Sequence, residues 1–311
     1  MARVVVTSPL SIDVRPLLAG HEVSGGSVRL DRAALLAAVA DADGLICLLS
    51  DRIDAELLDR APRLRVVANH AVGVDNVDLA ACAARGVAVA NTPDVLTEAT
   101  ADLAFALLLA VGRRLVEGDA LVRSGGWSGW APDQLLGADL AGRTLGIIGM
   151  GRIGQAVARR AAGFDLRIVY THPRPVAAPG SHVALEHLLA ESDFVSIHCP
   201  LTAATRGLIG ARELAAMKPT AILVNTARGP IVDEAALASV LAAGGLGGAG
   251  LDVFAEEPRV PEALRASPRV VILPHIGSAT LGTRARMATL CAEAVREVLA
   301  GRRPANLVTR P

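Results

Sequence analysis

Hydrophobic residues in the first part of the chain fall into short runs that alternate with helix-favouring segments. The runs at 4–7, 44–49, 64–69 and 87–91 read as buried strands, and helices are expected at 30–40, 55–60 and 79–85. Strands that alternate with helices predict a parallel sheet covered on both faces. Thr92, Pro93 and Asp94 then break the pattern, so we expect a first α/β unit that ends near residue 92.

The same alternation returns after a helical stretch. A strongly helical run covers 97–117, and a further helical segment ends at Ser124. Strands are then predicted at 145–148, 166–170, 194–198, 221–225, 250–253 and 270–273, with helices at 185–190, 212–217, 234–243 and 283–300. The sequence therefore predicts an α/β protein with two doubly wound parallel sheets.

A glycine-rich turn follows the strand at 145–148. Gly149, Gly151 and Gly154 form a G-x-G-x-x-G pattern that opens onto a helix-favouring run at 155–161. In this pattern the first glycine allows a tight turn, the second lets the backbone approach a pyrophosphate, and the third lets the helix pack on the strand. We interpret it as a dinucleotide site. The alternative is a purely structural strand-to-helix turn.

The end of the next strand indicates which dinucleotide binds. Thr171, His172, Pro173, Arg174 and Pro175 stand there, and none is acidic. An acidic residue would accept hydrogen bonds from the adenosine ribose, whereas His172 and Arg174 offer positive donors to a 2′-phosphate. The residues favour NADPH, with NADH possible. The alternative is that both side chains are merely solvated.

Composition narrows the class of partner. The 311 residues hold 31 basic and 31 acidic side chains, and the 52% of hydrophobic residues form no run long enough to span a membrane. This balance favours a small-molecule partner over nucleic acid or a membrane. The start of the chain has no signal-like segment, and the four cysteines are far apart and match no metal spacing, so we expect a cytoplasmic protein without a metal.

Three polar segments follow predicted strands of the second unit, at 225–229, 252–258 and 274–278. Each has an ordinary explanation by itself. Arg228 fits a surface charge, Glu257 an acidic turn before proline, and His275 a loop histidine. Their joint position at the carboxyl ends of parallel strands predicts a shared site, because a doubly wound sheet binds its ligand there.

These segments and the glycine turn together resemble the NAD(P)-dependent D-2-hydroxyacid dehydrogenases, over nearly the whole chain and in order. Within that family the chain is most similar to glyoxylate/hydroxypyruvate reductases, through the segments 47–51, 92–97 and 125–130. The resemblance implies that Arg228 binds the substrate carboxylate, that His275 gives a proton to the carbonyl oxygen, and that Glu257 stabilises the protonated ring. These roles suit a guanidinium, an imidazole and a carboxylate.

The resemblance also implies further site residues and a domain organisation. Leu49, the backbone N–H groups of Val72 and Gly73, and Trp130 would contact substrate, Trp130 from the neighbouring subunit of a homodimer. The alternative for Trp130 is an aromatic residue of an interface or of the core. The cofactor side would include Thr100, Arg152, Ile153, Pro200, Thr205, Thr226, Ala227, Asp252 and Gly277, with Asp252 near the nicotinamide amide. Residues 1–92 and 281–311 would form a substrate-binding domain and residues 93–280 an NAD(P)-binding domain, both Rossmann-like, with an active-site cleft between them.

Other functions remain compatible with this pattern. The substrate is expected to be a small 2-keto acid such as glyoxylate or hydroxypyruvate, but a bulkier pyruvate derivative is an alternative because the pocket lining decides it. The chain ends soon after its last helix, so we expect no regulatory domain of the kind found in longer phosphoglycerate dehydrogenases. A dinucleotide-sensing corepressor is an alternative outside the enzyme class, although neither an extended tail nor a basic patch favours it.

Overall fold

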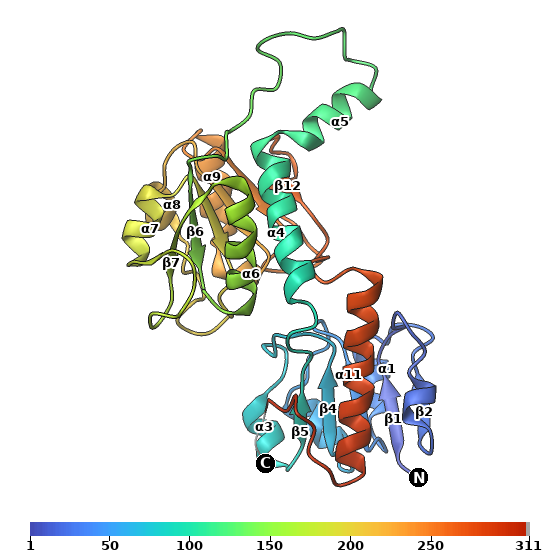
Figure 1. Cartoon of the computed structure of the whole chain (residues 1–311). Coiled ribbons are helices and arrows are strands. Elements are labelled where there is room, and N and C mark those ends of the chain that lie inside the picture. Colours follow the sequence, from blue (N-terminus) through green and yellow to red (C-terminus); the bar gives the residue numbers. More distant parts are fainter. Residues whose placement is uncertain (309–311) are drawn as a thin grey trace. The chain divides into compact units, whose positions relative to one another are not determined.

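The structure is a computed structural model that describes residues 1–308; positions 309–311 of the expected 281–311 segment lie outside the described residues. Contacts divide the chain into two units. Unit 1 comprises Met1–Leu96 and the chain from Ser278 onward, and unit 2 comprises Thr97–Gly277 (Figure 1). The chain therefore leaves unit 1 once and returns to it for its last helix.

Unit 1 is built on a parallel sheet of five strands. In the order β2-β1-β3-β4-β5 these are Glu22–Gly25, Arg3–Val6, Gly44–Cys47, Val66–Asn69 and Ala88–Ala90. Val4 and Val6 pack on one face of the sheet and Val5 on the other, because side chains alternate along a strand. Both faces are covered, so β1, β3, β4 and β5, apart from the edge strand β2, are largely apolar and buried.

The helices of unit 1 divide between the two faces of this sheet. The long α11 (Leu281–Leu299) covers one face with Ala288, Cys291, Ala292 and Val295 (Figure 1). The other helices are α1 (Arg32–Ala38), α2 (Ala55–Arg60), α3 (Leu79–Ala84) and the 3-10 turn η1 (Arg15–Leu18). Asp31, Asp54 and Asp78 begin α1, α2 and α3, and each carboxylate accepts a backbone N–H of the first turn, which explains why these helices start where they do.

Unit 2 holds a parallel sheet of seven strands in the order β12-β11-β10-β9-β6-β7-β8. These are Val270–Ile272, Gly248–Leu251, Ile222–Asn225, Phe194–Ile197, Thr144–Ile148, Arg167–Thr171 and Ser181–His182. The chain moves outward from β6 in one direction and from β9 in the other. The loops after β6 and β9 therefore flank the topological switch point, where sheets of this kind bind ligands.

Helices cover both faces of the second sheet as well. The helices of unit 2 are α4 (Thr97–Gly112), α5 (Leu115–Arg123), α6 (Arg152–Ala161), α7 (Leu185–Glu191), α8 (Ala211–Ala215), α9 (Glu234–Ala242) and α10 (Glu262–Arg265), with the 3-10 turns η2 (Ala162–Phe164) and η3 (Gly229–Ile231), and all but α5 contribute to covering the sheet. Phe105, Leu107 and Leu108 of α4 are buried with Ile222 and Val224 of β10. Helix α4 is thus part of the core of unit 2.

Most predicted elements are present, and the differences have local causes. The helical run expected at 97–117 is broken after Gly112, because Arg114 adopts a left-handed conformation with φ of 53° before α5 begins. The strands β2 and β8 were not predicted. Both lie at sheet edges and carry polar or exposed residues, so they lack the apolar run that marks a buried strand.

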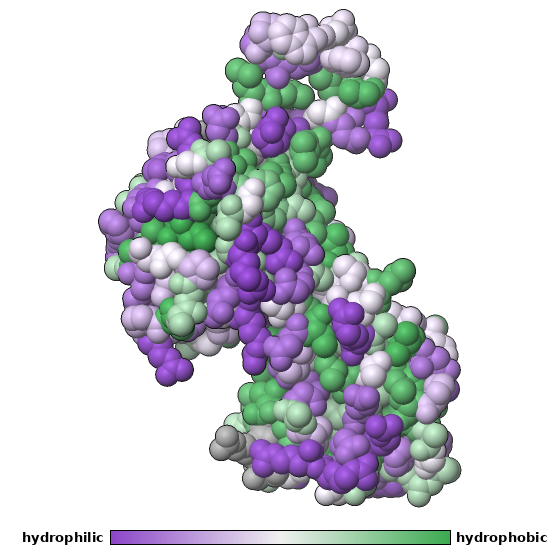
Figure 2. Space-filling view, in the orientation of Figure 1, coloured by the Kyte–Doolittle hydropathy of each residue, from purple (hydrophilic) through white to green (hydrophobic). Residues whose placement is uncertain are grey.

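Helix α5 and the segment after it project from the rest of unit 2 (Figure 1). No residue of α5 is buried. Leu115, Val116, Val122 and Leu136 of this projecting segment are exposed together with Trp127 and Trp130, and apolar side chains are visible on it in Figure 2. A helix whose apolar side chains face only water is unusual, because a surface helix normally packs its apolar face on the core.

Candidate active site

The glycine turn connects β6 to α6. Gly149 has φ of 96°, a conformation that side chains disfavour, and a β-carbon there would lie 2.5 Å from the backbone nitrogen of Cys199. A β-carbon on Gly154 would lie 2.2 Å from the Gly149 carbonyl oxygen, so this glycine permits close packing of α6. Gly151 caps α6 with open space around it. The backbone of the first helical turn, with Arg152 and Ile153, is accessible to a phosphate group.

His172 and Arg174 follow the end of β7, at the place where sequence predicted the cofactor-selecting residues. Arg174 is exposed, and His172 is half-buried with no hydrogen-bond partner for Nδ1 within the described chain. The His172 backbone carbonyl accepts Nε2 of His182 at 2.9 Å, which ties this segment to β8. Both basic side chains thus lie near the end of β7, and within residues 1–308 neither is paired with a carboxylate.

The other predicted cofactor positions surround the same edge of the sheet. Pro200 and Thr205 lie in the loop after β9, where the Thr205 hydroxyl donates to the Pro200 carbonyl at 2.6 Å. Thr226 and Ala227 follow β10, and the Thr226 hydroxyl is buried without a hydrogen-bond partner in residues 1–308. Thr100 of α4 lies beside Gly277, since a β-carbon on that glycine would lie 3.4 Å from the threonine methyl carbon.

Asn225, at the end of β10, shapes the loop that carries Arg228. Its side-chain oxygen accepts the Ala227 N–H at 3.0 Å, and its amide donates to the Arg228 carbonyl at 2.9 Å. A β-carbon on Gly229 would lie 1.9 Å from the Phe254 carbonyl carbon, so only glycine allows this loop to touch the segment after β11. This contact brings Arg228 near Glu257.

Asp252 holds the loop that contains His275. Its carboxylate is completely buried and accepts the backbone N–H groups of Ile276 and Gly277, each at 2.7 Å. His275 itself has φ of 55°, a left-handed conformation that is costly for a residue with a side chain. Asp252 therefore stabilises an unfavourable backbone conformation at the histidine. Burial raises the pKa of the Asp252 carboxyl, although the two N–H groups and His275 oppose that effect.

His275 and Glu257 form a hydrogen-bonded pair. Nδ1 of the imidazole lies 2.8 Å from Oε2 of the carboxylate, and the other carboxylate oxygen accepts the Phe254 N–H at 3.0 Å. The side chains are 22% and 30% exposed, so a substrate can still reach them. Burial raises the pKa of the Glu257 carboxyl, but the hydrogen bonds from His275 and Phe254 and the charge of Arg228 outweigh it and lower the pKa overall. Glu257 is consequently an anion near neutral pH.

The substrate positions predicted in unit 1 lie in the loops after β3 and β4. Leu49, Val72 and Gly73 are all half-buried there. Trp130 lies in the projecting segment of unit 2 and is 82% exposed. Trp130 is therefore not covered by any other residue group of the described chain.

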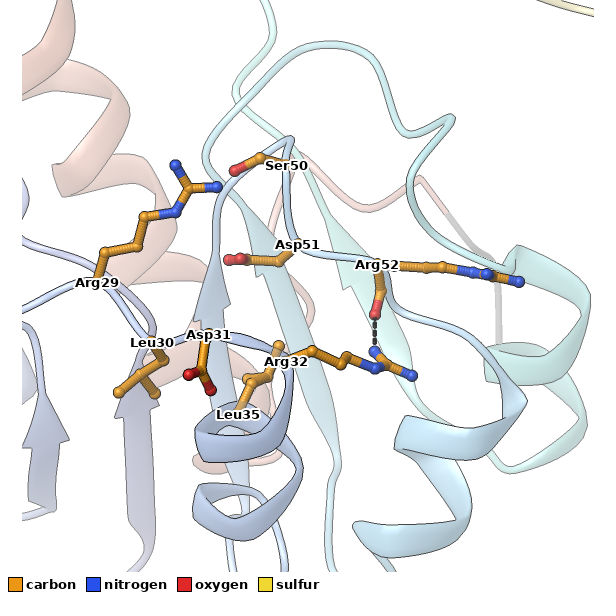
Figure 3. A pocket seen from close by; sticks show the side chains of 8 residues that line it. All are labelled: Arg29, Leu30, Asp31, Arg32, Leu35, Ser50, Asp51 and Arg52. Atoms are coloured by element: carbon orange, nitrogen blue, oxygen red, sulfur yellow. Dashed lines mark hydrogen bonds between the residues drawn. The ribbon is translucent and has the colours of Figure 1, made fainter. Parts of the chain in front are cut away.

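Two cavities lie near these loops, one in each unit. In unit 2 a cavity of about 300 Å³ adjoins His275 and Glu257 and is lined mainly by apolar residues, among them Phe254, Val260 and Ile272. In unit 1 a cavity of about 470 Å³ is lined by Arg29, Leu30, Asp31, Arg32, Leu35, Ser50, Asp51 and Arg52 (Figure 3). There Arg32 and Arg52 both pair with Asp54, while the carboxylates of Asp31 and Asp51 accept backbone or hydroxyl hydrogen bonds.

The described chain offers neither a metal cluster nor a membrane-spanning helix. Within residues 1–308, no group of three or more His, Cys, Asp or Glu side chains is arranged to hold a metal ion. None of the helices in that part of the chain combines the length and the apolar character needed to cross a membrane.

The site fits a nicotinamide dinucleotide. The turn from Gly149 to Gly154 leaves backbone accessible at the start of α6, and Thr226 keeps a buried hydroxyl without a partner at the same edge of the described sheet. A histidine paired with a carboxylate, with an arginine nearby, is chemically able to transfer a proton and to bind an anion. Fold and site together define an oxidoreductase of the dinucleotide-dependent dehydrogenase class.

Comparison with known proteins agrees with this class. Residues 105–277 match the model of the D-isomer specific 2-hydroxyacid dehydrogenase, NAD binding domain. A glyoxylate reductase of Thermococcus litoralis is 51% identical over 288 residues, covering 90% of this chain and 87% of that protein. The chain belongs to the D-isomer specific 2-hydroxyacid dehydrogenase family and is an oxidoreductase.

Solved structures show the same fold. The TT0316 protein from Thermus thermophilus is 52% identical, with a TM-score of 0.94, covering 99% of this chain and 100% of that chain. An NADPH-dependent glyoxylate/hydroxypyruvate reductase from Sinorhizobium meliloti, in complex with NADP and malonate, is 37% identical with a TM-score of 0.87. That match covers 99% of this chain and 97% of the other.

Proposed function

We propose that the protein reduces a small 2-keto acid, glyoxylate or hydroxypyruvate, to the D-2-hydroxy acid with NADPH. The observation that carries the proposal is the 2.8 Å contact between His275 Nδ1 and Glu257 Oε2, at the sheet edge that also carries Arg228 and the glycine turn. Glyoxylate reductases at about 50% identity support the choice of substrate.

Each residue of the catalytic trio has a distinct task. Arg228 binds the substrate carboxylate, because a guanidinium is always charged and matches the two oxygens of a carboxylate. His275 donates a proton to the carbonyl oxygen during reduction and accepts it back in the reverse direction. Glu257 occupies Nδ1, which directs Nε2 toward the substrate and stabilises the protonated ring.

When bound, the dinucleotide would supply the hydride that reduces the carbonyl carbon of the substrate. Gly149, Gly151, Arg152, Ile153 and Gly154 would hold its pyrophosphate at the start of α6. The remaining cofactor contacts proposed are Thr100, Pro200, Thr205, Thr226, Ala227, Asp252 and Gly277. For Asp252 the hydrogen bonds to residues 276 and 277 add a second task, which is to fix the loop of His275.

We propose a preference for NADPH over NADH. The support is the set of residues after β7, where His172 and Arg174 are present and no acidic side chain follows the strand. A 2′-phosphate carries about two negative charges near neutral pH, so positive donors there favour it over a ribose hydroxyl.

We also propose a homodimer in which Trp130 contacts the substrate of the neighbouring subunit. Its support is the projecting segment, where α5 has no buried residue and Leu115, Val116 and Val122 are more than half exposed. Such side chains are stabilised when a second copy covers them. The proposed substrate contacts within unit 1 are Leu49, Val72 and Gly73.

A bulkier 2-keto acid is the second candidate substrate. The apolar cavity of about 300 Å³ beside His275 favours it, because branched or aromatic side chains could occupy such a space. A panel of glyoxylate, hydroxypyruvate, pyruvate and phenylpyruvate separates the two candidates by their kcat/KM values.

The stereochemical outcome tests the proposal. Hydroxypyruvate is reduced with NADPH to completion, and the glycerate is resolved by chiral chromatography. The proposal predicts D-glycerate, whereas L-glycerate, or no glycerate, would contradict it.

A further inference from the structure

The loop after β4 contains two backbone N–H groups whose orientation is fixed by hydrogen bonds to the carbonyl groups of the same peptides. These belong to Val72 and Gly73, the proposed contacts of the substrate carboxylate, so the inference rests on the proposed function. A peptide group is planar and trans, and its C=O and N–H therefore point in opposite directions. Whatever holds the carbonyl of one residue also aims the N–H of the next.

Both carbonyls concerned are held by residues just after β5. The Ala71 carbonyl accepts the backbone N–H of Thr92 at 2.9 Å, which fixes the peptide that carries the Val72 N–H. The Val72 carbonyl accepts Nδ2 of Asn91 at 2.7 Å, which fixes the peptide that carries the Gly73 N–H. The first contact is made by backbone and is available to many residue types. The second depends on the side chain of Asn91.

The Gly73 carbonyl is held in a similar way by a second asparagine. Asn69, which is completely buried at the end of β4, donates from Nδ2 to this oxygen at 2.8 Å and to Oδ1 of Asn76 at 3.0 Å. Asn76 in turn donates to the carbonyls of Leu48 and Asp51, at 3.1 and 2.9 Å. The loop that carries Leu49 is thereby joined to the loop that carries Val72 and Gly73.

We propose that Asn91 is a positioning residue for substrate binding. By holding the Val72 carbonyl it aims the Gly73 N–H at the substrate carboxylate. An N–H that already points at its acceptor binds without the entropy cost of ordering the loop. An amide is required, because it donates a hydrogen bond to a carbonyl without adding a negative charge next to an anionic substrate.

Asn91→Ala removes this donor, and Asn91→Asp keeps the shape while presenting an oxygen to the Val72 carbonyl. Asp78→Ala is the control. It removes another side-chain hydrogen bond to backbone in unit 1, in which the Asp78 carboxylate accepts the Ala81 N–H at 2.9 Å, and leaves the contacts of Asn91 and Thr92 in place. All four proteins, including wild type, are compared by thermal unfolding, by the KM for glyoxylate and for NADPH, and by the Ki of oxalate.

The proposal predicts that both Asn91 variants raise the KM for glyoxylate and the Ki of oxalate about ten-fold or more. The KM for NADPH should change less than about two-fold, because the dinucleotide residues lie in unit 2. Asp78→Ala should lose thermal stability, because α3 loses its N-cap, without changing either constant for the anions. Equal keto-acid constants in Asn91→Ala, Asn91→Asp and wild type would overturn the positioning role while leaving the reductase intact. Absence of turnover in wild type would instead overturn the proposed function, and this inference with it.

Discussion

Glu257 Oε2 lies 2.8 Å from Nδ1 of His275, and Asp252 independently holds the backbone on the far side of that histidine. The ring is thus fixed through a side chain and its loop through two backbone N–H groups. Because Nδ1 is occupied, Nε2 is the ring nitrogen left for proton transfer, and we propose that it exchanges a proton with substrate. The loops after β11 and β12 therefore determine the orientation of the His275 ring.

Glu257→Gln should lower kcat for keto-acid reduction at least about ten-fold, because a neutral amide stabilises the protonated imidazole far less than a carboxylate. Steady-state kcat with glyoxylate provides the test. Glu256→Gln is the matched control, since the neighbouring Glu256 is exposed and pairs with Arg259. An unchanged kcat in Glu257→Gln, or an equal loss in both variants, would contradict the role given to Glu257.

Arg174→Ala should raise the KM for NADPH about ten-fold, equivalent to roughly 1.4 kcal/mol, and leave the KM for NADH within about two-fold. The reason is that only NADPH carries the 2′-phosphate that the guanidinium is proposed to bind. Arg212→Ala, which removes another exposed arginine of unit 2, serves as control. The assignment fails if both cofactors are affected equally.

A mixing experiment tests whether Trp130 acts in the neighbouring subunit. The His275→Ala protein should be inactive, and Trp130→Ala should be active with a raised KM for the keto acid. If the two are unfolded and refolded together, a mixed dimer contains one site with an intact histidine and the partner's intact tryptophan. Activity at low substrate should therefore exceed the sum of the two separate proteins. Simple additivity would show that Trp130 acts within its own subunit, or not at all.

His70 makes folding stability depend on pH. Burial, with a smaller effect of the Arg284 charge, lowers its pKa from 6.5 to about 4. Between these values the unfolded chain binds a proton that the folded chain does not. Stability should therefore fall as pH decreases from 6.5 to 4, by roughly 3 kcal/mol for this one group.

Urea unfolding of wild type and His70→Gln at several pH values measures that contribution as a difference. The variant should show a shallower fall in stability over this range. His187→Gln, with a side chain that is 63% exposed in wild type, should behave like wild type. Parallel curves for wild type and His70→Gln would rule out the buried, uncharged state of His70.

The sequence predicted the parts of the fold that have apolar runs. Central strands such as β4, β9 and β10 are buried on both faces, so they are mainly apolar and can be recognised in the sequence. Edge strands and the break at Arg114 depend on pairing and on one backbone conformation, which no apolar pattern records. The glycine turn was readable because a strand, a spacing and a helix all agreed.

The sequence drew attention to the charged residues of the candidate site, but it did not reveal the asparagine side chains that hold the surrounding loops. Arg228, Glu257 and His275 stand out as polar residues at strand ends. The contacts of Asn69, Asn91 and Asn225 with backbone carbonyls could be known only once the loops were placed. A signal was nevertheless present, because each of these asparagines ends a strand or follows it directly.

The central claim is reduction of a small 2-keto acid with His275 as proton donor. Its most direct test is the initial rate of NADPH and NADH oxidation with glyoxylate and with hydroxypyruvate, in wild type and in His275→Ala. The account predicts rapid oxidation of NADPH with both keto acids and a loss of at least about a hundred-fold in the variant, with dinucleotide binding unchanged. Tight dinucleotide binding without turnover of any keto acid in wild type, or full activity in His275→Ala, would contradict it.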